Sequence, residues 1–280
     1  MRHFVYHSVQ FFVPHWTAFV TRSRKTLIGA WVRSALIDFW ESKLDSSVMR
    51  FFGLVVAFWV SLGTFASAQQ QPVVVELYTS QGCSSCPPAD GLLAQLAERD
   101  DVIALAFHVD YWDYIGWKDQ FADPAHTVRQ RGYSRAAGKP SIYTPQMVIG
   151  GVDHVVGANA MKLADAINAH RSRAKPAAVT MRRDGDKIMV SVNAEGRMPS
   201  GGAIIQVATV TPEETVDIRR GENAGRTLTY HNVVRRLVEV GTWNGRGTYR
   251  ATIQVPDGVR VAVLVQGKAS GPILGAAQLR

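Results

Sequence analysis

Two buried-strand patterns separated by one helix constrain the fold of this chain more than any other feature. Residues 73–79 and 102–109 are almost continuously apolar and rich in β-branched residues, which is typical of strands covered on both faces. Residues 89–99, between them, carry leucines at helical spacing. A strand, a helix and a strand in this order predict a βαβ unit with parallel strands and a right-handed crossover.

A different pattern begins near residue 175. Before it, residues 110–140 are rich in aromatic and charged side chains and end in a helical pattern, and a third strand and an amphipathic helix follow them. Beyond it, short apolar–polar alternations of period two are separated by turns rich in Gly, Asp and Asn. We therefore expect an α/β domain over residues 69–174 and an antiparallel β-sandwich domain over residues 175–280.

A targeting segment precedes these domains. Residues 49–68 combine a short basic start, an apolar run and a small-residue end, which is the order of a secretory signal peptide cleaved after Ala68. An uncleaved anchor is the alternative, but the apolar run is short for a bilayer. We expect translation to start at Met49, so that residues 1–48 are an upstream extension. The mature protein would then be periplasmic or secreted, and would meet the membrane only during export.

The net charge does not favour nucleic acid as a partner. The formal charge is +8, but residues 1–68 hold seven Lys or Arg against three Asp or Glu, which is half of the excess. The remaining positive charge is spread along the chain without a Lys/Arg stripe. Because 46% of the residues are hydrophobic, the chain can bury a core, and wholesale disorder is excluded.

Cys83 and Cys86 are the only cysteines, and they stand as Cys-x-x-Cys between the first strand and the first helix. A structural disulfide here would close a loop too short to gain much stability. Two thiolates are half of a tetrahedral metal site, and copper or zinc would need further ligands from His108, His154 or Met147. A redox pair is the third interpretation, since a helix N-terminus favours the Cys83 thiolate and Cys86 lies one turn further on.

Three motifs occur together in the mature chain: Cys-x-x-Cys at the start of the first helix, Thr144-Pro145 before the next strand, and the string VELYTSQGCSSCPPAD over residues 75–90. In the first two the chain resembles the thioredoxin superfamily. In the third it resembles a narrower family of secreted bacterial proteins catalogued as a domain of unknown function. The resemblance runs from about residue 72 to the C-terminus. It implies a thioredoxin-like fold with a helical insertion near residues 110–140, followed by the C-terminal β-sandwich.

The resemblance also implies roles for individual residues. Cys83 matches the cysteine that attacks a substrate, and Cys86 matches the one that resolves the mixed disulfide. Pro145 matches a cis-proline facing the cysteines, and Thr144 would present its backbone to an extended peptide. An ordinary trans proline that opens a strand is the alternative. The two serines between the cysteines depart from the better-known pairs, so neither the reduction potential nor the direction of the reaction transfers.

Glu76 and Trp112 complete the candidate site. By the resemblance, Glu76 would accept a proton from Cys86, but it stands one residue further from Cys83 than the corresponding acid in plain thioredoxins. A shift of one residue turns a strand side chain to the other sheet face, so a purely structural role for Glu76 is the alternative. Trp112 and its aromatic neighbours would line a peptide groove or pack the insertion against the sheet.

These observations predict a periplasmic or secreted protein that carries out thiol–disulfide exchange through its cysteine pair. We expect its partners to be extracytoplasmic protein thiols or disulfides together with a redox partner of unidentified nature, and we expect no organic cofactor. Two alternatives stay open. One is a copper- or zinc-handling protein that uses the same cysteines with His or Met, and the other is a non-catalytic module that binds a partner.

Overall fold

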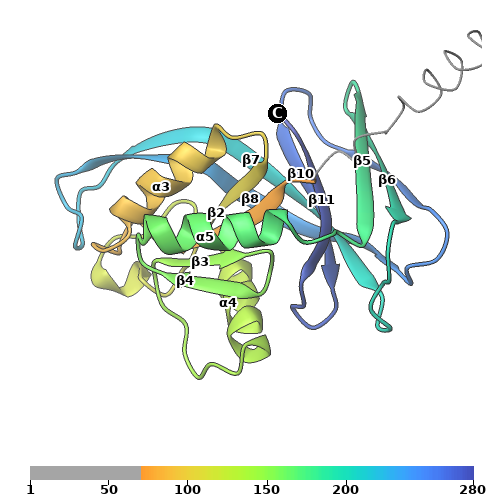
Figure 1. The fold of residues 1–280 in the computed structure, drawn as a ribbon. Helices are drawn as coiled ribbons and strands as arrows, with labels where there is room; N and C mark the ends of the chain where they lie inside the picture. Colours follow the sequence, from red (N-terminus) through yellow and green to blue (C-terminus); the bar gives the residue numbers. More distant parts are fainter. Residues whose placement is uncertain (1–70) are drawn as a thin grey trace, which may run out of the picture. The chain divides into compact units, whose positions relative to one another are not determined.

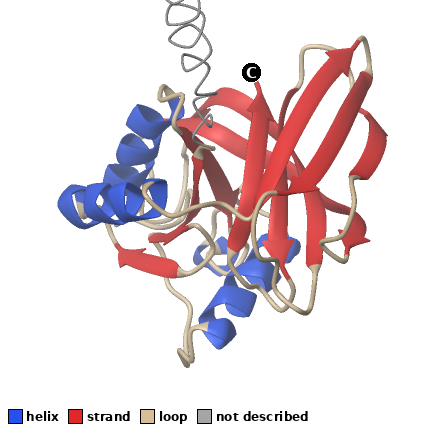
Figure 2. Cartoon of the chain, turned by 45° about the vertical axis from the view of Figure 1, so that its right-hand side comes forward, coloured by secondary structure: helices blue, strands red, loops and turns tan. Residues whose placement is uncertain are grey.

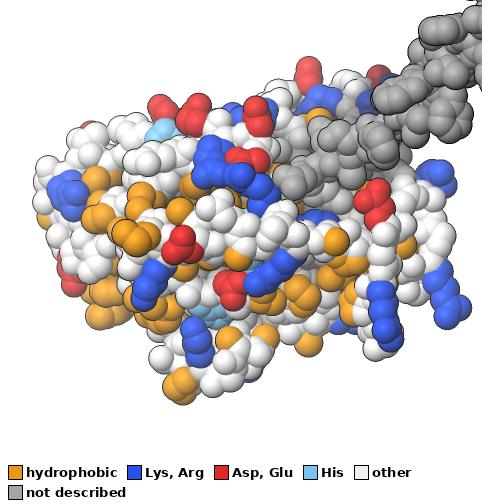
Figure 3. Space-filling model, in the orientation of Figure 1, with side chains coloured by type: hydrophobic (Ala, Val, Ile, Leu, Met, Phe, Trp, Pro, Cys, Tyr) orange, Lys and Arg blue, Asp and Glu red, His pale blue; other side chains and the backbone are white. Residues whose placement is uncertain are grey.

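The computed structural model of the protein describes residues 71–280. The expected upstream extension and signal peptide, residues 1–48 and 49–68, lie outside the described residues. In the described part, none of the helices combines the length and the apolar character that crossing a membrane requires. Acidic and basic side chains are intermingled on the face shown in Figure 3.

The predicted βαβ unit is confirmed. Strand β1 (Val73–Thr79) and strand β2 (Val102–His108) are parallel neighbours, and helix α3 (Pro87–Ala97) connects them (Figure 1). Both strands are buried along their whole length, as their continuous apolar sequence requires. Two prolines occupy the first turn of α3, where a backbone N–H would have no helical acceptor.

The next segment adds two helices and two antiparallel strands. A 3-10 turn, η1 (Asp113–Ile115), precedes helix α4 (Pro124–Ala136), whose first turn is capped by the carboxylate of Asp123, which accepts a hydrogen bond from the backbone N–H of Ala125. Strand β3 (Gln146–Ile149) pairs antiparallel with β1, strand β4 pairs with β3, and helix α5 follows. The bounds of these last two are Asp153–Val156 and Ala160–Arg171.

The C-terminal region consists of strands, as its period of two predicts. Their bounds are β5 (Ala177–Asp184), β6 (Lys187–Ala194), β7 (Ala203–Asp217), β8 (Thr227–Trp243), β9 (Tyr249–Gln254), β10 (Arg260–Gly267) and β11 (Ile273–Leu279). These strands do not form a separate domain. Four of them continue the sheet that β1 to β4 begin, in the order β11-β10-β7-β8-β2-β1-β3-β4, and the other three form a separate sheet, β5-β6-β9.

The predicted fold class, an α/β thioredoxin-like domain followed by an antiparallel sandwich, is therefore wrong. The described residues are mostly β, with a mixed eight-stranded sheet, a three-stranded sheet and three α-helices. The junction is the parallel pairing of β2 with β8 at Ala106 and Val233. Period-two alternation identifies a strand and its buried face, but it does not specify which strand lies beside it. For that reason the sequence pattern did not predict that β8 pairs with β2.

The large sheet is covered on both faces. Val75 and Leu77 of β1 pack with Leu93 of α3 and Ile167 of α5, while Tyr78 packs with α4 on the other face. Along β10, alternate residues point to opposite sides, and one set faces the three-stranded sheet. Figure 2 shows helices at the left and at the lower centre of the view, and strands across its right-hand side.

A buried ion pair joins the two regions. The guanidinium of Arg129, on α4, donates from Nε and Nη2 to the two carboxylate oxygens of Glu76 on β1, both at 2.7 Å. Its Nη1 donates to the side-chain oxygens of Gln206 on β7 and Gln266 on β10, at 3.1 and 3.0 Å. The hydroxyl of Tyr133 donates to Glu76 at 2.7 Å and accepts from Arg129 and Gln266. One charged cluster thus connects α4 with three strands of the large sheet.

We expect Arg129→Met to destabilise the fold by about 3–5 kcal/mol, because it leaves the carboxylate of Glu76 buried without its counter-charge. Urea denaturation followed by circular dichroism measures this loss. The matched control is Arg135→Met, an exposed arginine on the same helix, for which the change should stay within about 0.5 kcal/mol. Equal losses in the two variants would contradict a structural role for the ion pair.

Candidate functional site

The two cysteines form a disulfide at the junction of β1 and α3, with Cα atoms 5.4 Å apart. Cys86 is the N-cap of α3, and Cys83 lies in the turn before it, where its backbone N–H donates to Ser80. Both are buried, with exposed fractions of 2% for Cys83 and 0% for Cys86. The two serines between them are exposed, so hydroxyl groups are what this turn presents to solvent.

The loop between β7 and β8 covers this turn. The side-chain amide of Asn223 donates to the carbonyl oxygens of Gln81 and Cys83, both at 2.9 Å. The carboxylate of Glu222 accepts from the backbone N–H of Ser84 at 3.1 Å and from its hydroxyl at 2.6 Å. These two hydrogen bonds lower the pKa of Glu222. We call residues 218–226 the cover loop.

Sequence reasoning missed the cover loop, because it comes from the region assigned to a separate sandwich. Within the loop, the guanidinium of Arg226 donates to the side-chain oxygen of Asn223 at 2.9 Å. Nothing in the spacing along the chain links that segment to Cys83, since 140 positions separate Asn223 from Cys83.

Trp112 connects the cysteine turn with the segment that contains Pro145. Its indole N–H donates to the hydroxyl of Thr144 at 2.7 Å. On the other side, a β-carbon added to Gly82 would lie 3.1 Å from the Cβ of Trp112, so this neighbour of Cys83 has little room for a side chain. The Thr144–Pro145 peptide bond is cis, as the sequence analysis expected. Trp112 therefore lies close to Gly82 in the cysteine turn and is hydrogen-bonded to Thr144.

Glu76 lies elsewhere. Its side chain points to the face of β1 that packs against α4, while α3 covers the opposite face through Val75 and Leu77. Its carboxylate accepts four hydrogen bonds, two from Arg129 and one each from Tyr78 and Tyr133. A carboxylate that is fully engaged in this way is not placed to accept a proton from Cys86. Glu76 stands one residue away from the position of the acid in plain thioredoxins, and a shift of one residue turns a strand side chain to the other face of the sheet.

Another buried acid lies next to the cysteines. Asp90 follows Cys86 by one helical turn on α3, and its backbone N–H donates to the carbonyl oxygen of Cys86 at 3.1 Å. The pKa of Asp90 is raised to about 7, chiefly by burial and in small part by the charge of Asp119, while His108 and the nearby Thr79 hydroxyl act to lower it. The Thr79 hydroxyl is close enough to act on this carboxylate, but neither carboxylate oxygen of Asp90 accepts a hydrogen bond of normal length and angle.

His108 faces the same buried region from the end of β2. Its Nδ1 lies 2.7 Å from Oδ2 of Asp119, and the same oxygen accepts from the backbone N–H of Gln81 at 2.8 Å. The imidazole packs edge-on against the rings of Phe121 and Tyr230. Its Nε2 is buried without a hydrogen-bond partner, as are the hydroxyls of Thr79 and Tyr230. Unpaired polar atoms are therefore concentrated beneath α3.

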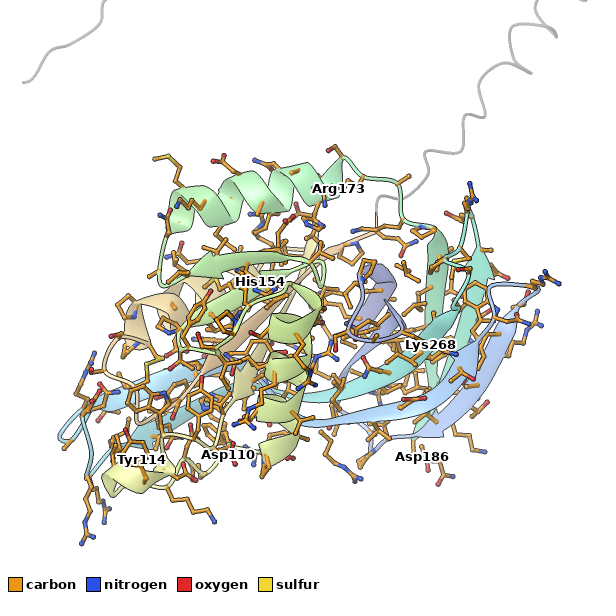
Figure 4. The ribbon with its side chains drawn as sticks, turned by 90° about the horizontal axis from the view of Figure 1, so that it is seen from below. Asp110, Tyr114, His154, Arg173, Asp186 and Lys268 are labelled. Atoms are coloured by element: carbon orange, nitrogen blue, oxygen red, sulfur yellow. A yellow bond between two sulfur atoms is a disulfide. The ribbon has the colours of Figure 1, made fainter. Side chains whose placement is uncertain are left out.

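His154 and Met147, two of the further metal ligands that the sequence analysis considered, have other contacts. His154 contacts the side-chain amide of Gln146 at 3.1 Å, and Met147 belongs to the core between β1 and α5. Figure 4 shows His154 on β4, away from Asp110 and Tyr114, which mark the end with η1. Within residues 71–280, no group of three or more His, Cys, Asp or Glu side chains is arranged to hold a metal ion.

Comparison with known proteins matches residues 74–266 to the family described as "Protein of unknown function (DUF1223)". A crystal structure of a protein from Agrobacterium tumefaciens is similar, with 35% sequence identity, a TM-score of 0.63, and coverage of 76% of this chain and 96% of that one. HBP35 of Porphyromonas gingivalis has 15% identity, a TM-score of 0.54 and coverage of 75% of each chain, so this likeness concerns the fold alone. No curated protein matches the chain.

We expect Asn223→Ala to speed reduction of the Cys83–Cys86 disulfide by dithiothreitol, because two hydrogen bonds that hold the cover loop are lost. A loss of about 1–2 kcal/mol from local closure raises the open population roughly 5- to 30-fold. Timed alkylation with a mass-tagged maleimide measures the rate. Asn244→Ala, in the exposed β8–β9 turn, is the matched control and should react at the wild-type rate. An unchanged rate in Asn223→Ala would show that the loop does not control access.

The raised pKa of Asp90 predicts how stability depends on pH. Between its ordinary value of 3.8 and about 7, the folded state holds the proton and the unfolded state does not, so stability falls as the pH rises through this window. We expect the free energy of unfolding of Asp90→Asn, relative to that of wild type, to rise by about 3 kcal/mol from pH 5 to pH 8. Urea denaturation at both pH values measures it. Asp165→Asn, an exposed acid on α5, is the control, and a gain of the same size there would contradict the prediction.

Proposed function

Because the chain belongs to the DUF1223 family, whose description assigns no function, we propose one from its site: thiol–disulfide exchange through Cys83 and Cys86, in the periplasm or outside the cell. The observation that carries the proposal is the Cys83–Cys86 disulfide in the turn that begins α3. A cross-link between residues three positions apart constrains the unfolded chain very little. Stability therefore explains the pair poorly, and reversible oxidation explains it better.

The surroundings of the disulfide support the same chemistry. The N-terminal end of α3 favours negative charge, so a thiolate formed there is stabilised relative to one in bulk solvent. The motifs that resemble the thioredoxin superfamily, Cys-x-x-Cys and Thr144-Pro145, are linked through Trp112. This resemblance is one of local motifs and chemistry, since the overall fold differs. Electrons pass directly between sulfur atoms, so the reaction needs no organic cofactor.

The substrate would be a thiol or disulfide of another extracytoplasmic protein. In our proposal Cys83 forms the mixed disulfide and Cys86 resolves it. The backbone at Thr144 and Pro145 would pair with an extended segment of the substrate, and the half-buried indole of Trp112 would lie beside it. Cys83 is only 2% exposed, so the protein around it, in our proposal the cover loop, would have to move before a protein substrate reaches its sulfur.

A redox titration tests this function. The purified protein is equilibrated in glutathione or dithiothreitol buffers of graded potential, and free thiols are counted after alkylation. We expect one reversible two-electron transition, which Cys83→Ser abolishes. A pair that resists reduction at every potential, or thiols that stay blocked until a chelator removes stoichiometric metal, would overturn the exchange proposal in favour of a structural or metal-binding pair.

A matched pair of variants tests the two roles separately. Cys86→Ser keeps the attacking thiol but cannot resolve, so it should accumulate mixed disulfides with protein substrates that non-reducing gels reveal. Cys83→Ser should accumulate far fewer, because the sulfur of Cys86 is fully buried. The opposite pattern would exchange the two assignments.

A further inference from the structure

The strongest unexplained feature of the molecule is the unpaired acid beneath the cysteines. Asp90 is 7% exposed, and among the described residues neither of its carboxylate oxygens accepts a hydrogen bond of normal length and angle, although the Thr79 hydroxyl lies close enough to act on it. Buried polar groups in folded proteins are nearly always paired, since leaving one unpaired costs its full desolvation free energy. An acid kept in this condition needs an explanation.

Glu76 shows how this protein pairs a buried acid that has a structural role. The carboxylate of Glu76, equally inaccessible, receives a bidentate guanidinium and two tyrosine hydroxyls. Asp90 receives no guanidinium or ammonium group, and the imidazole of His108 offsets the effect of burial on its pKa only in part. The residues that face it bring polar atoms with free hydrogen-bonding capacity instead: the hydroxyl of Thr79, Nε2 of His108 and the hydroxyl of Tyr230, from β1, β2 and β8. The contrast indicates that Asp90 is not held as a permanent ion.

The position of Asp90 on α3 relates it to one cysteine. Residues four apart on a helix share a face, and their Cβ atoms lie about 5–6 Å from each other. Cys86 already has helical backbone angles, and its carbonyl oxygen accepts the backbone N–H of Asp90. Both side chains are buried, so the shared face points into the protein. Asp90 is also the acidic residue of the first turn of α3.

We propose that Asp90 exchanges a proton with the sulfur of Cys86 during thiol–disulfide exchange, an inference that rests on the function proposed above. When the reduced protein acts on a disulfide, Cys83 carries the substrate in a mixed disulfide. The Cys86 thiol gives its proton to Asp90 and attacks the sulfur of Cys83. The bond between Cys83 and the substrate breaks, and the substrate sulfur leaves with the electron pair as a thiolate. In the reverse direction Cys86 leaves as the thiolate and takes the proton back.

The electrostatics suit this exchange. A general acid–base group works best when its pKa lies near the pH at which it acts, and burial holds the pKa of Asp90 at about 7. Of the titratable groups that face it, His108 lowers this pKa and Asp119 raises it. The carboxylate of Asp119 also holds the imidazole of His108 in place through the Nδ1 atom of His108. Because His108 lowers the pKa of Asp90, removal of His108 should shift the proton exchange of Asp90 to higher pH.

A two-step chromogenic reaction isolates the step assigned to Asp90. The reduced protein is mixed with an excess of Ellman's reagent, which releases one thionitrobenzoate when Cys83 attacks it and a second when Cys86 closes the disulfide. We expect Asp90→Asn to slow the second release on the order of 10²-fold at pH 7. The first release should change less than about twofold, because it does not involve Cys86. The pH dependence of the second release near pH 7 should disappear in this variant.

Two further variants and one control separate the outcomes. His108→Gln should keep the second release but move its midpoint to higher pH, and Asp165→Asn should match wild type in both phases. The proposal for Asp90 is overturned if Asp90→Asn releases the second equivalent at the wild-type rate and with the wild-type pH profile. The proposed function itself fails in a different way, if the reduced wild-type protein never releases a second equivalent. Circular dichroism confirms that each variant is folded.

Discussion

The buried ion pair of Glu76 and Arg129 is the interaction on which the rest of the structure depends. Glu76 lies on β1, the strand that leads to the cysteines, and Arg129 reaches it from α4 while also binding Gln206 and Gln266 of β7 and β10. A buried charge is tolerated only where such partners surround it, so these elements must come together in one arrangement. The ion pair therefore fixes the C-terminal strands against the βαβ unit.

The candidate site is a consequence of that arrangement. Once β8 lies beside β2, the loop that joins it to β7 reaches the cysteine turn, and Asn223 binds the carbonyl oxygens of Gln81 and Cys83. The same strand brings Tyr230 against His108. A cysteine pair on a βαβ unit alone would be open to solvent on this side. Here Glu222 and Asn223 of the cover loop bind it, although the loop lies about 140 positions further along the chain.

The two buried acids show how far sequence reasoning reached. The strand pattern around Glu76 and the one-residue shift from the thioredoxin position raised the alternative that it faces away from the cysteines, and in the structure its carboxylate binds Arg129 and Tyr133 of α4. Asp90 stood in the same motif string and received no role. Its importance depends on having no partner, and a sequence cannot show an absent hydrogen bond, because the partners that might have been present come from β1, β2 and β8.

The sequence by itself determined the βαβ unit and placed Cys83 and Cys86 together at the start of its helix, since both follow from spacing and burial within a few neighbouring residues. It did not determine the fold class. Whether the C-terminal strands form their own sandwich or extend the sheet at β2 is a choice between backbone partners distant in the chain, and both arrangements satisfy the same alternation. Only the tertiary structure, through the side chains that meet Arg129 and the cover loop that meets Cys83, decides between them.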